Sequence, residues 1–186
     1  MRVPHALARR DGGHADIPMI KAAQTLGFHV VTSGNRANDL GHAYGDEVHL
    51  ADFSDREAIL NLARDLRVDA VMPSCNDFSA LSCAWAAQEL GLPGHDSYDV
   101  ARRLHHKDLY RAFAKDTGIA TPRAASCKTI EDGIAATLTM TFPVIVKPVD
   151  LTGGKGISVA RDFKELKQSL ARAINTTRAG RVVVEE

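Results

Sequence analysis

Two lysines and a group of glycines are the residues of this chain whose types and spacing best suit chemistry. Lys147 lies near the end of a short apolar run at residues 142–148, and residues 152–157 then place three glycines around Lys155. An ammonium group next to a buried run is costly unless an anion meets it. Glycines allow backbone N–H groups to approach an anion without obstruction by Cβ. We therefore predict a phosphate site here, with a nucleotide as the ligand.

The lysine-bearing run itself has the pattern of a short buried strand. Four apolar residues stand in a row, β-branched types dominate, and a proline at each end confines the run. Side chains alternate between the faces of a strand, so Ile145 and Lys147 share one face. This placement predicts that Ile145 packs against the base of the nucleotide.

The glycine loop is not a Walker A motif. That motif requires Gly-Lys followed by Ser or Thr and then a helix, whereas Gly156 follows Lys155 and residues 157–160 continue as a strand. We expect a hairpin with a glycine-rich tip. For the loop taken alone, an ordinary hairpin turn with a solubilising lysine stays open as the alternative.

Composition and charge exclude several classes of protein. The chain has 186 residues, 45 % hydrophobic and 25 % charged, which is typical of one soluble domain or two small ones. Lysine plus arginine and aspartate plus glutamate both number 23, so the basic surface of a nucleic-acid-binding protein is not expected. No apolar run approaches the roughly 18 residues of a membrane span, and the first residues lack the apolar core of a signal peptide. We expect a cytoplasmic protein without membrane partners, whose three cysteines are reduced.

The first half alternates strands and helices. Strands are expected at residues 3–8, where Pro4 weakens the pattern, and at 28–31, 47–50 and 68–72. Helices are expected at 17–26 and 78–90, with another opened by a capping box of Ser54 and Glu57. This alternation predicts a parallel sheet covered by helices. Ligands bind beyond the carboxyl ends of such strands, so two loops are candidate substrate sites or, alternatively, plain connections: Gly12, Gly13 and His14, and Ser74, Asn76 and Asp77.

The pattern changes near residue 95. Helices are expected at 106–117 and 129–140, a third is capped by Asp162, and strands are expected at 142–148, 157–160 and 181–186. This order predicts a separate small α+β subdomain, with one domain at residues 1–103 and the next at 104–186.

Taken together, the second-half motifs resemble the ATP-grasp superfamily of ATP-dependent carboxylate ligases, which includes biotin carboxylase, carbamoyl-phosphate synthase and D-alanine–D-alanine ligase. The resemblance covers Lys107, the segment 118–122, the lysine strand, the glycine loop and residues 182–186. The first half is similar to the Rossmann-like pre-ATP-grasp domain. The expected fold is therefore α/β: a Rossmann-like pre-ATP-grasp domain with a parallel sheet, followed by the α+β N-terminal subdomain of an ATP-grasp fold.

The resemblance also implies ligands and roles. ATP and a small carboxylate are the implied ligands, and the reaction converts the carboxylate to an acyl-phosphate, which an amine or other nucleophile attacks. Lys107 and Lys147 would contact the phosphates and Ile145 would lie beside adenine. The residues Gly153, Gly154, Lys155 and Gly156 would form a flexible loop over the phosphates, and Glu185 and Glu186 would begin the hinge segment at the adenine edge. No residue is implied as catalytic.

The chain departs from the family at both ends. It stops at Glu186, where the family continues into a second subdomain that carries the magnesium ligands. We therefore expect a truncated chain without metal ligands, inactive alone, although Mg²⁺ is expected for the full-length family. At the other end, Arg9, Arg10 and Asp11 stand where an apolar strand is expected, and a misread N-terminus would explain them.

Two other interpretations stay open. The chain would be a non-catalytic ATP-binding module if a partner chain supplied the metal half. The first half would instead be a dinucleotide-binding domain, although it lacks a full Gly-x-Gly-x-x-Gly pattern. An uncovered apolar sheet face would also favour self-association, for example as a homodimer.

Overall fold

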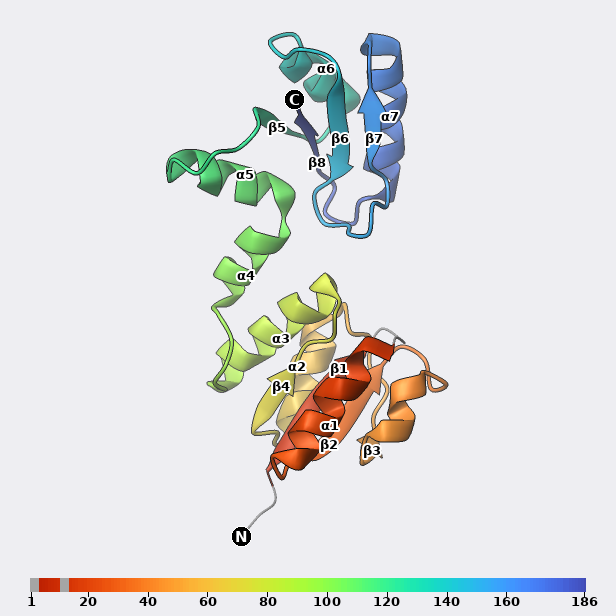
Figure 1. The fold of residues 1–186 in the computed structure, drawn as a ribbon, viewed down its shortest axis with the longest axis vertical. Coiled ribbons are helices and arrows are strands. Elements are labelled where there is room, and N and C mark those ends of the chain that lie inside the picture. Colours follow the sequence, from red (N-terminus) through yellow and green to blue (C-terminus); the bar gives the residue numbers. More distant parts are fainter. Residues whose placement is uncertain (1–3, 11–13) are drawn as a thin grey trace. The chain divides into compact units, whose positions relative to one another are not determined.

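The chain forms two compact units, Met1–Ala101 and Arg102–Glu186. The structure is a computed structural model that describes residues 4–10 and 14–186. Figure 1 draws the first unit from red to yellow and the second from green to blue. Each unit has its own sheet and its own hydrophobic core. Within the described residues, no helix is both long enough and apolar enough to cross a membrane.

The first unit is built on a four-stranded parallel sheet in the order β3-β2-β1-β4. Its strands are β1 His5–Arg10, β2 His29–Gly34, β3 Glu47–Val48 and β4 Ala70–Met72. Its helical segments are η1 His14–Asp16, α1 Ile17–Thr25, η2 Leu40–Tyr44, α2 Arg56–Asp65 and α3 Asp77–Leu90. A parallel sheet has to be covered on both faces. Helices α2 and α3 pack with Leu7 and Val31 on one face, and α1 packs with Ala8 and Val30 on the other.

The first strand corrects the sequence interpretation. The strand was expected at residues 3–8, with Arg9 and Arg10 standing against an apolar strand, but β1 runs from His5 through Arg10 and pairs with both β2 and β4. Pro4 lies just before the strand, where its missing N–H disrupts no ladder bond, and its carbonyl accepts a hydrogen bond from His29 N at 2.9 Å. Strand β2 also continues through Ser33 and Gly34, beyond residue 31, where the strand was expected to end.

The start of α2 is a second correction. Asp55, not Ser54, is the N-cap, and its carboxylate accepts hydrogen bonds from Glu57 N at 3.0 Å and Ala58 N at 3.1 Å. Ser54 Oγ instead donates to Asp52 at 2.7 Å. A carboxylate at this position meets both the exposed N–H groups and the positive end of the helix dipole.

The second unit is an α+β subdomain with an antiparallel sheet in the order β5-β8-β6-β7. Its strands are β5 Ala124–Cys127, β6 Val144–Pro148, β7 Ser158–Ala160 and β8 Val182–Glu185. Its helices are α5 Lys107–Asp116, α6 Ile130–Thr137 and α7 Phe163–Thr176, and α4 Tyr98–His105 spans the boundary between the units. The sequence pattern predicted the hairpin of β6 and β7 but missed α4 and β5.

The two faces of this second sheet differ in character. Val144, Val146 and Val184 lie on the face that packs against α6 and α7. Residues paired across antiparallel strands share a face. Ile145 is paired with Glu185, and Lys147 with Val183, so these four residues lie on the opposite face. The predicted alternation therefore places Ile145 and Lys147 together, away from the main core of the unit.

Candidate functional site

Glu185 is a buried carboxylate on the face of the second sheet that also carries Ile145 and Lys147. Its side chain is only 3 % exposed, and Lys147 Nζ lies 2.5 Å from its Oε2. From α5, Arg111 donates from Nε to Oε1 at 2.9 Å and from Nη2 to Oε2 at 3.3 Å. Burial alone would raise the pKa of Glu185, but the hydrogen bonds from Arg111 and Lys147 outweigh it and hold the pKa below its ordinary value. The carboxylate is thus ionised and shared by two cations.

Lys107 is bound to the chain segment that follows Lys147. As the first residue of α5, it donates from its backbone N–H to Val149 O at 3.0 Å and from Nζ to Leu151 O. Asp150, in the same segment, is 2 % exposed. It accepts hydrogen bonds from Thr177 Oγ1 and from the N–H groups of residues 178 and 179. The fold therefore places Lys107 next to the segment that joins Lys147 to the glycine loop.

The glycine loop has a backbone that only glycine adopts easily. Gly153, Gly154 and Gly156 have φ values of +64°, +76° and +72°. A Cβ at Gly156 would also lie 2.7 Å from Pro148 Cγ, whereas one at Gly153 or Gly154 would meet open space. The residues from Thr152 to Lys155 are exposed. The loop is thus an accessible turn whose base is packed against the end of β6.

Glu186 is held separately from Glu185. Its carboxylate accepts a hydrogen bond from Thr141 N and lies 3.2 Å from Arg123 Nε, and its N–H donates to Arg123 O at 3.1 Å. The two glutamates predicted to begin the hinge segment therefore have different partners, and their roles toward adenine stay predictions.

The sequence interpretation missed the charged residues that fix α5 to the sheet. Asp108 is 6 % exposed and accepts from Arg181 Nε at 2.8 Å and Ser126 Oγ at 3.0 Å. Burial acts to raise the pKa of Asp108, but these hydrogen bonds lower it overall. Arg111, also missed, stands four residues after Lys107 and hence on the same helix face. The four-residue spacing of Lys107 and Arg111 is the feature of the sequence from which a role for Arg111 could have been predicted.

The described substrate-loop residues lie after neighbouring strands of the first sheet. His14 follows β1 and the segment from Ser74 to Asp77 follows β4, and parallel neighbours end at the same edge. Ser74 is 8 % exposed, and its Oγ has no hydrogen-bond partner among the described residues. The side chain of Asn76 caps α3 by accepting from Phe78 N at 2.9 Å. Gly12 and Gly13 lie outside the described residues.

A hollow of about 310 Å³ lies where β2 ends. It is lined by Gly34, Asn35, Leu50, Ala51 and Asp52. Asn35 Nδ2 donates to Asp52 Oδ1 at 3.1 Å and fixes part of this wall. Since β2 is parallel to β1, this hollow and the candidate substrate loops follow the same ends of neighbouring strands.

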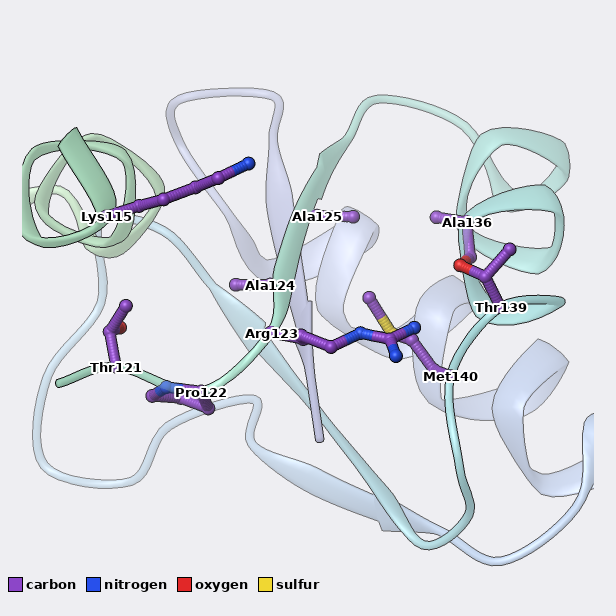
Figure 2. Close-up of a pocket in the computed structure, with 9 residues that line it drawn as sticks. All are labelled: Lys115, Thr121, Pro122, Arg123, Ala124, Ala125, Ala136, Thr139 and Met140. Carbon is purple, nitrogen blue, oxygen red and sulfur yellow. The ribbon is translucent and has the colours of Figure 1, made fainter. Parts of the chain in front are cut away.

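A second hollow, of about 470 Å³, lies beside the edge strand β5. Figure 2 shows its wall, which α5, β5 and α6 share, with Lys115 and Arg123 as its basic side chains. It contains none of the residues predicted to bind ATP. The candidate nucleotide site therefore rests on the arrangement of side chains on the sheet face and not on this hollow.

Metal-binding side chains do not cluster in the described structure. Among residues 4–10 and 14–186, no group of three or more histidine, cysteine, aspartate or glutamate residues is placed to hold a metal ion. Cys75, Cys83 and Cys127 form no disulfide with one another, and burial raises the pKa of Cys127 to about 11.

Two family models match the chain and together define its class. The ATP-grasp N-terminal domain matches residues 20–94, and the ATP-binding domain of the carbamoyl-phosphate synthase L chain matches residues 106–186. The chain belongs to the ATP-grasp superfamily, as the motifs of the second half predicted.

Curated relatives give more particular similarities. The chain is 29 % identical over 173 residues to the formate-dependent phosphoribosylglycinamide formyltransferase of Rhodococcus jostii, covering 90 % of this chain and 42 % of the relative. It is 26 % identical over 148 residues to the N-terminal section of the carbamoyl phosphate synthase large chain of Methanopyrus kandleri, covering 76 % of this chain and 26 % of that relative. The chain thus spans less than half the length of either relative.

Solved structures confirm the predicted fold class. N5-carboxyaminoimidazole synthetase from Staphylococcus aureus, complexed with ADP, is similar with a TM-score of 0.78 and 21 % identity, covering 98 % of this chain and 47 % of that one. A second similar structure is the biotin carboxylase domain dimer of the 2-oxoglutarate carboxylase from Hydrogenobacter thermophilus, in complex with MgADP, ADP and bicarbonate. Its TM-score is 0.77 and its sequence identity 20 %, and the match covers 100 % of this chain and 44 % of that one. At these identities the likeness establishes the fold.

Proposed function

We propose that this chain is the ATP-binding portion of an ATP-grasp ligase that activates a carboxylate as an acyl-phosphate. The observation that carries the proposal is the convergence of Ile145 and Lys147 on one sheet face with Lys107 and the glycine loop next to the same strand. The similar proteins named above include ligase-like enzymes and structures that contain ADP. In this proposal residues 1–103 act as the pre-ATP-grasp domain and residues 104–186 as the N-terminal ATP-grasp subdomain.

The proposed site binds ATP through charge and shape. Lys107, Lys147 and Lys155 neutralise phosphate charge, and the N–H groups of Gly153 to Gly156 donate to phosphate oxygens. Ile145 provides an apolar wall for adenine, and the backbone of the segment that begins at Glu185 donates and accepts at the adenine edge. These interactions hold the triphosphate in a fixed position, which is the main contribution of a protein to phosphoryl transfer.

The proposed reaction begins with attack of a substrate carboxylate oxygen on the γ-phosphorus of ATP. The bond from the β–γ bridging oxygen to that phosphorus breaks, ADP leaves with the electron pair, and an acyl-phosphate remains. An amine or other nucleophile then attacks the acyl carbon and releases phosphate. The lysines offset the negative charge that moves onto ADP. Magnesium is expected with the nucleotide. Among the described residues no group of three or more histidine, cysteine, aspartate or glutamate side chains is placed to hold it, so we assign no step to a metal.

The carboxylate substrate is assigned to the carboxyl edge of the first sheet. Gly12, Gly13, His14, Ser74 and Asp77 are the candidate contacts, by the general rule for ligands of open parallel sheets. The hydroxyl of Ser74 supports this assignment because it is buried without a hydrogen-bond partner among the described residues. Asn76 would support the loop through its cap on α3.

Calorimetric titration with Mg-ATP tests the proposal directly. Lys147→Met should weaken ATP binding by about tenfold or more, since a charge that pairs with phosphate is lost. Lys167→Met is the matched control, because Lys167 is an exposed lysine of α7, which packs on the other face of the sheet. Equal affinities for the two variants would contradict the proposal.

Hydrolysis assays on the same proteins separate the two forms of the proposal. One form is a ligase portion that turns over ATP by itself, and the other is an ATP-binding module that acts with a partner chain. Binding without turnover would support that module. Turnover that depends on Lys147 would instead show that the chain catalyses by itself.

A further inference from the structure

The buried carboxylate of Glu185 carries two cationic partners where one would neutralise it. Lys147 reaches it from the neighbouring strand β6, and Arg111 reaches it from α5. The three formal charges sum to plus one. A single pair of Lys147 and Glu185 would instead sum to zero and would offer an incoming anion no net attraction. The second cation thus gives this group of three side chains a net positive charge.

Arg111 binds the carboxylate of Glu185 more firmly than Lys147 does. Its guanidinium makes two hydrogen bonds to Glu185, at 2.9 Å and 3.3 Å, and Nη1 lies 3.4 Å from Thr121 Oγ1. A guanidinium is planar, stays charged in proteins and matches a carboxylate with two parallel donors. Lys147, by contrast, makes one contact through a flexible stem. When an anion competes, the ammonium is therefore the partner that can turn away from Glu185.

The free-energy cost of moving the ammonium of Lys147 away from Glu185 depends on Arg111. A buried carboxylate that loses all its partners is strongly destabilising. With Arg111 in place, Glu185 keeps two hydrogen bonds after Lys147 has moved to a phosphate. Without Arg111, each phosphate contact made by Lys147 would leave Glu185 buried and unpaired.

We propose that Arg111 is a positioning residue of the nucleotide site, which holds Glu185 so that Lys147 can bind the phosphates of ATP. The inference rests on the proposed function, because it requires Lys147 to be a phosphate ligand. It assigns to Arg111 an action through Glu185 and no contact with the nucleotide.

The test uses two ligands and a double variant. Affinities for Mg-ATP and for inorganic tripolyphosphate are measured by calorimetry on wild type, Arg111→Met, Glu185→Gln and the double variant. Arg111→Met should lower the affinity for both ligands by about tenfold, since Glu185 then retains the ammonium of Lys147. The affinities of the double variant for both ligands should lie within about threefold of those of Glu185→Gln, because no carboxylate then competes for Lys147. Arg111→Lys should recover only part of the affinity lost in Arg111→Met, since the charge remains but the two parallel donors do not.

Two results would overturn the inference. One is an Arg111→Met variant with wild-type affinities. The other is a double variant as weak as Arg111→Met, which would show that the guanidinium contacts the ligand or acts only by supporting the fold. Unfolding curves check that each variant is folded, and Arg111→Gln, which keeps a polar side chain without charge, replaces the methionine variant if that one does not fold.

Lys147→Met separates this inference from the proposed function. If Lys147→Met leaves both affinities unchanged, the proposed function is wrong and the role of Arg111 is wrong with it. If Lys147→Met weakens binding but Arg111→Met does not, only the role of Arg111 is overturned.

Discussion

At the scale of single residues, the environment of Glu185 links the stability of the second unit to its proposed ligand. A glutamate that is 3 % exposed would be unfavourable without partners. Arg111 and Lys147 supply them from two different elements, α5 and β6. The same ion pairs that stabilise the fold therefore hold the lysine that is proposed to bind phosphate.

This arrangement predicts a pH dependence of stability. The pKa of Glu185 is lowered in the folded chain from its ordinary value of 4.5, so the unfolded chain takes up the proton first as the pH falls. The stabilising contribution is therefore complete at neutral pH and is lost as the pH falls below about 4.5 and through the folded-state pKa. Glu185→Gln should lower the free energy of unfolding by about 1–3 kcal/mol at neutral pH, and its curve should approach wild type in acid.

Urea unfolding across the acid range checks this expectation. Glu131→Gln, at an exposed position of α6, is the control and should run parallel to wild type. A Glu185→Gln curve that stays parallel to wild type down to acid pH would contradict the account. The pKa of Asp108 is also lowered, so the free energy of unfolding should keep some dependence on pH in every variant.

The glycine loop offers a second prediction at the residue scale. Gly153→Ala should lower stability by about 1 kcal/mol, since its positive φ disfavours a side chain. Gly156→Ala should lower it by about 2–3 kcal/mol, because the new Cβ also meets Pro148 at 2.7 Å. Denaturant midpoints of the two variants compare these effects directly. Equal losses would mean that the loop moves away from Pro148 without cost.

At the scale of elements, short-range rules explain most helices and strands, and neighbouring elements explain the exceptions. Thr129 and Asp132 form a capping box at the start of α6, and Asp162 caps α7 as predicted, by accepting from Glu165 N. Strand β5 was missed because β8, the strand with which it pairs, comes more than fifty residues later in the sequence. The pairing partner, not the local pattern, makes this segment a strand.

The cap of α2 gives a prediction at this scale. Asp55→Ala should lower stability by about 1 kcal/mol, because two N–H groups of the first turn lose their acceptor. Ser54→Ala should have a smaller effect, since its hydroxyl contacts only Asp52 in a turn. Thermal unfolding of both variants distinguishes them, and the opposite ranking would restore Ser54 as the cap.

At the scale of the whole molecule, the chain is two units with separate cores. All residues predicted to bind ATP lie in the second unit, and the candidate substrate loops lie in the first. This division predicts that nucleotide binding and substrate binding can be disrupted independently.

A shortened chain of residues 96–186, which keeps α4 intact, tests this division. It should unfold cooperatively and bind ATP within about threefold of the full chain, since every proposed contact is retained. Circular dichroism and calorimetry provide the readouts. A folded fragment without ATP binding would show that the first unit contributes to the nucleotide site.

Self-association also belongs to this scale and stays a prediction. The first unit has an apolar groove of about 220 Å³ along α1 and β4, with Leu26 76 % exposed beside it. Exposed apolar surface of this kind favours association. Sedimentation velocity at increasing concentration should show a rising average mass, and a monomer throughout would contradict the expectation.

Local pattern alone was enough to predict the alternation of elements, the lysine strand and the glycine hairpin, whereas the superfamily was predicted from a resemblance to known proteins. These features depend on side-chain periodicity, turn chemistry and spacing, which are properties of neighbouring residues. The tertiary structure decided that β1 is central despite its arginines, and that Asp55 rather than Ser54 caps α2. It also decided that Arg111 and Lys147 meet at Glu185. Arg111 and Glu185 are 74 positions apart, and no local pattern contains such a contact, because it exists only once α5, β6 and β8 have packed together.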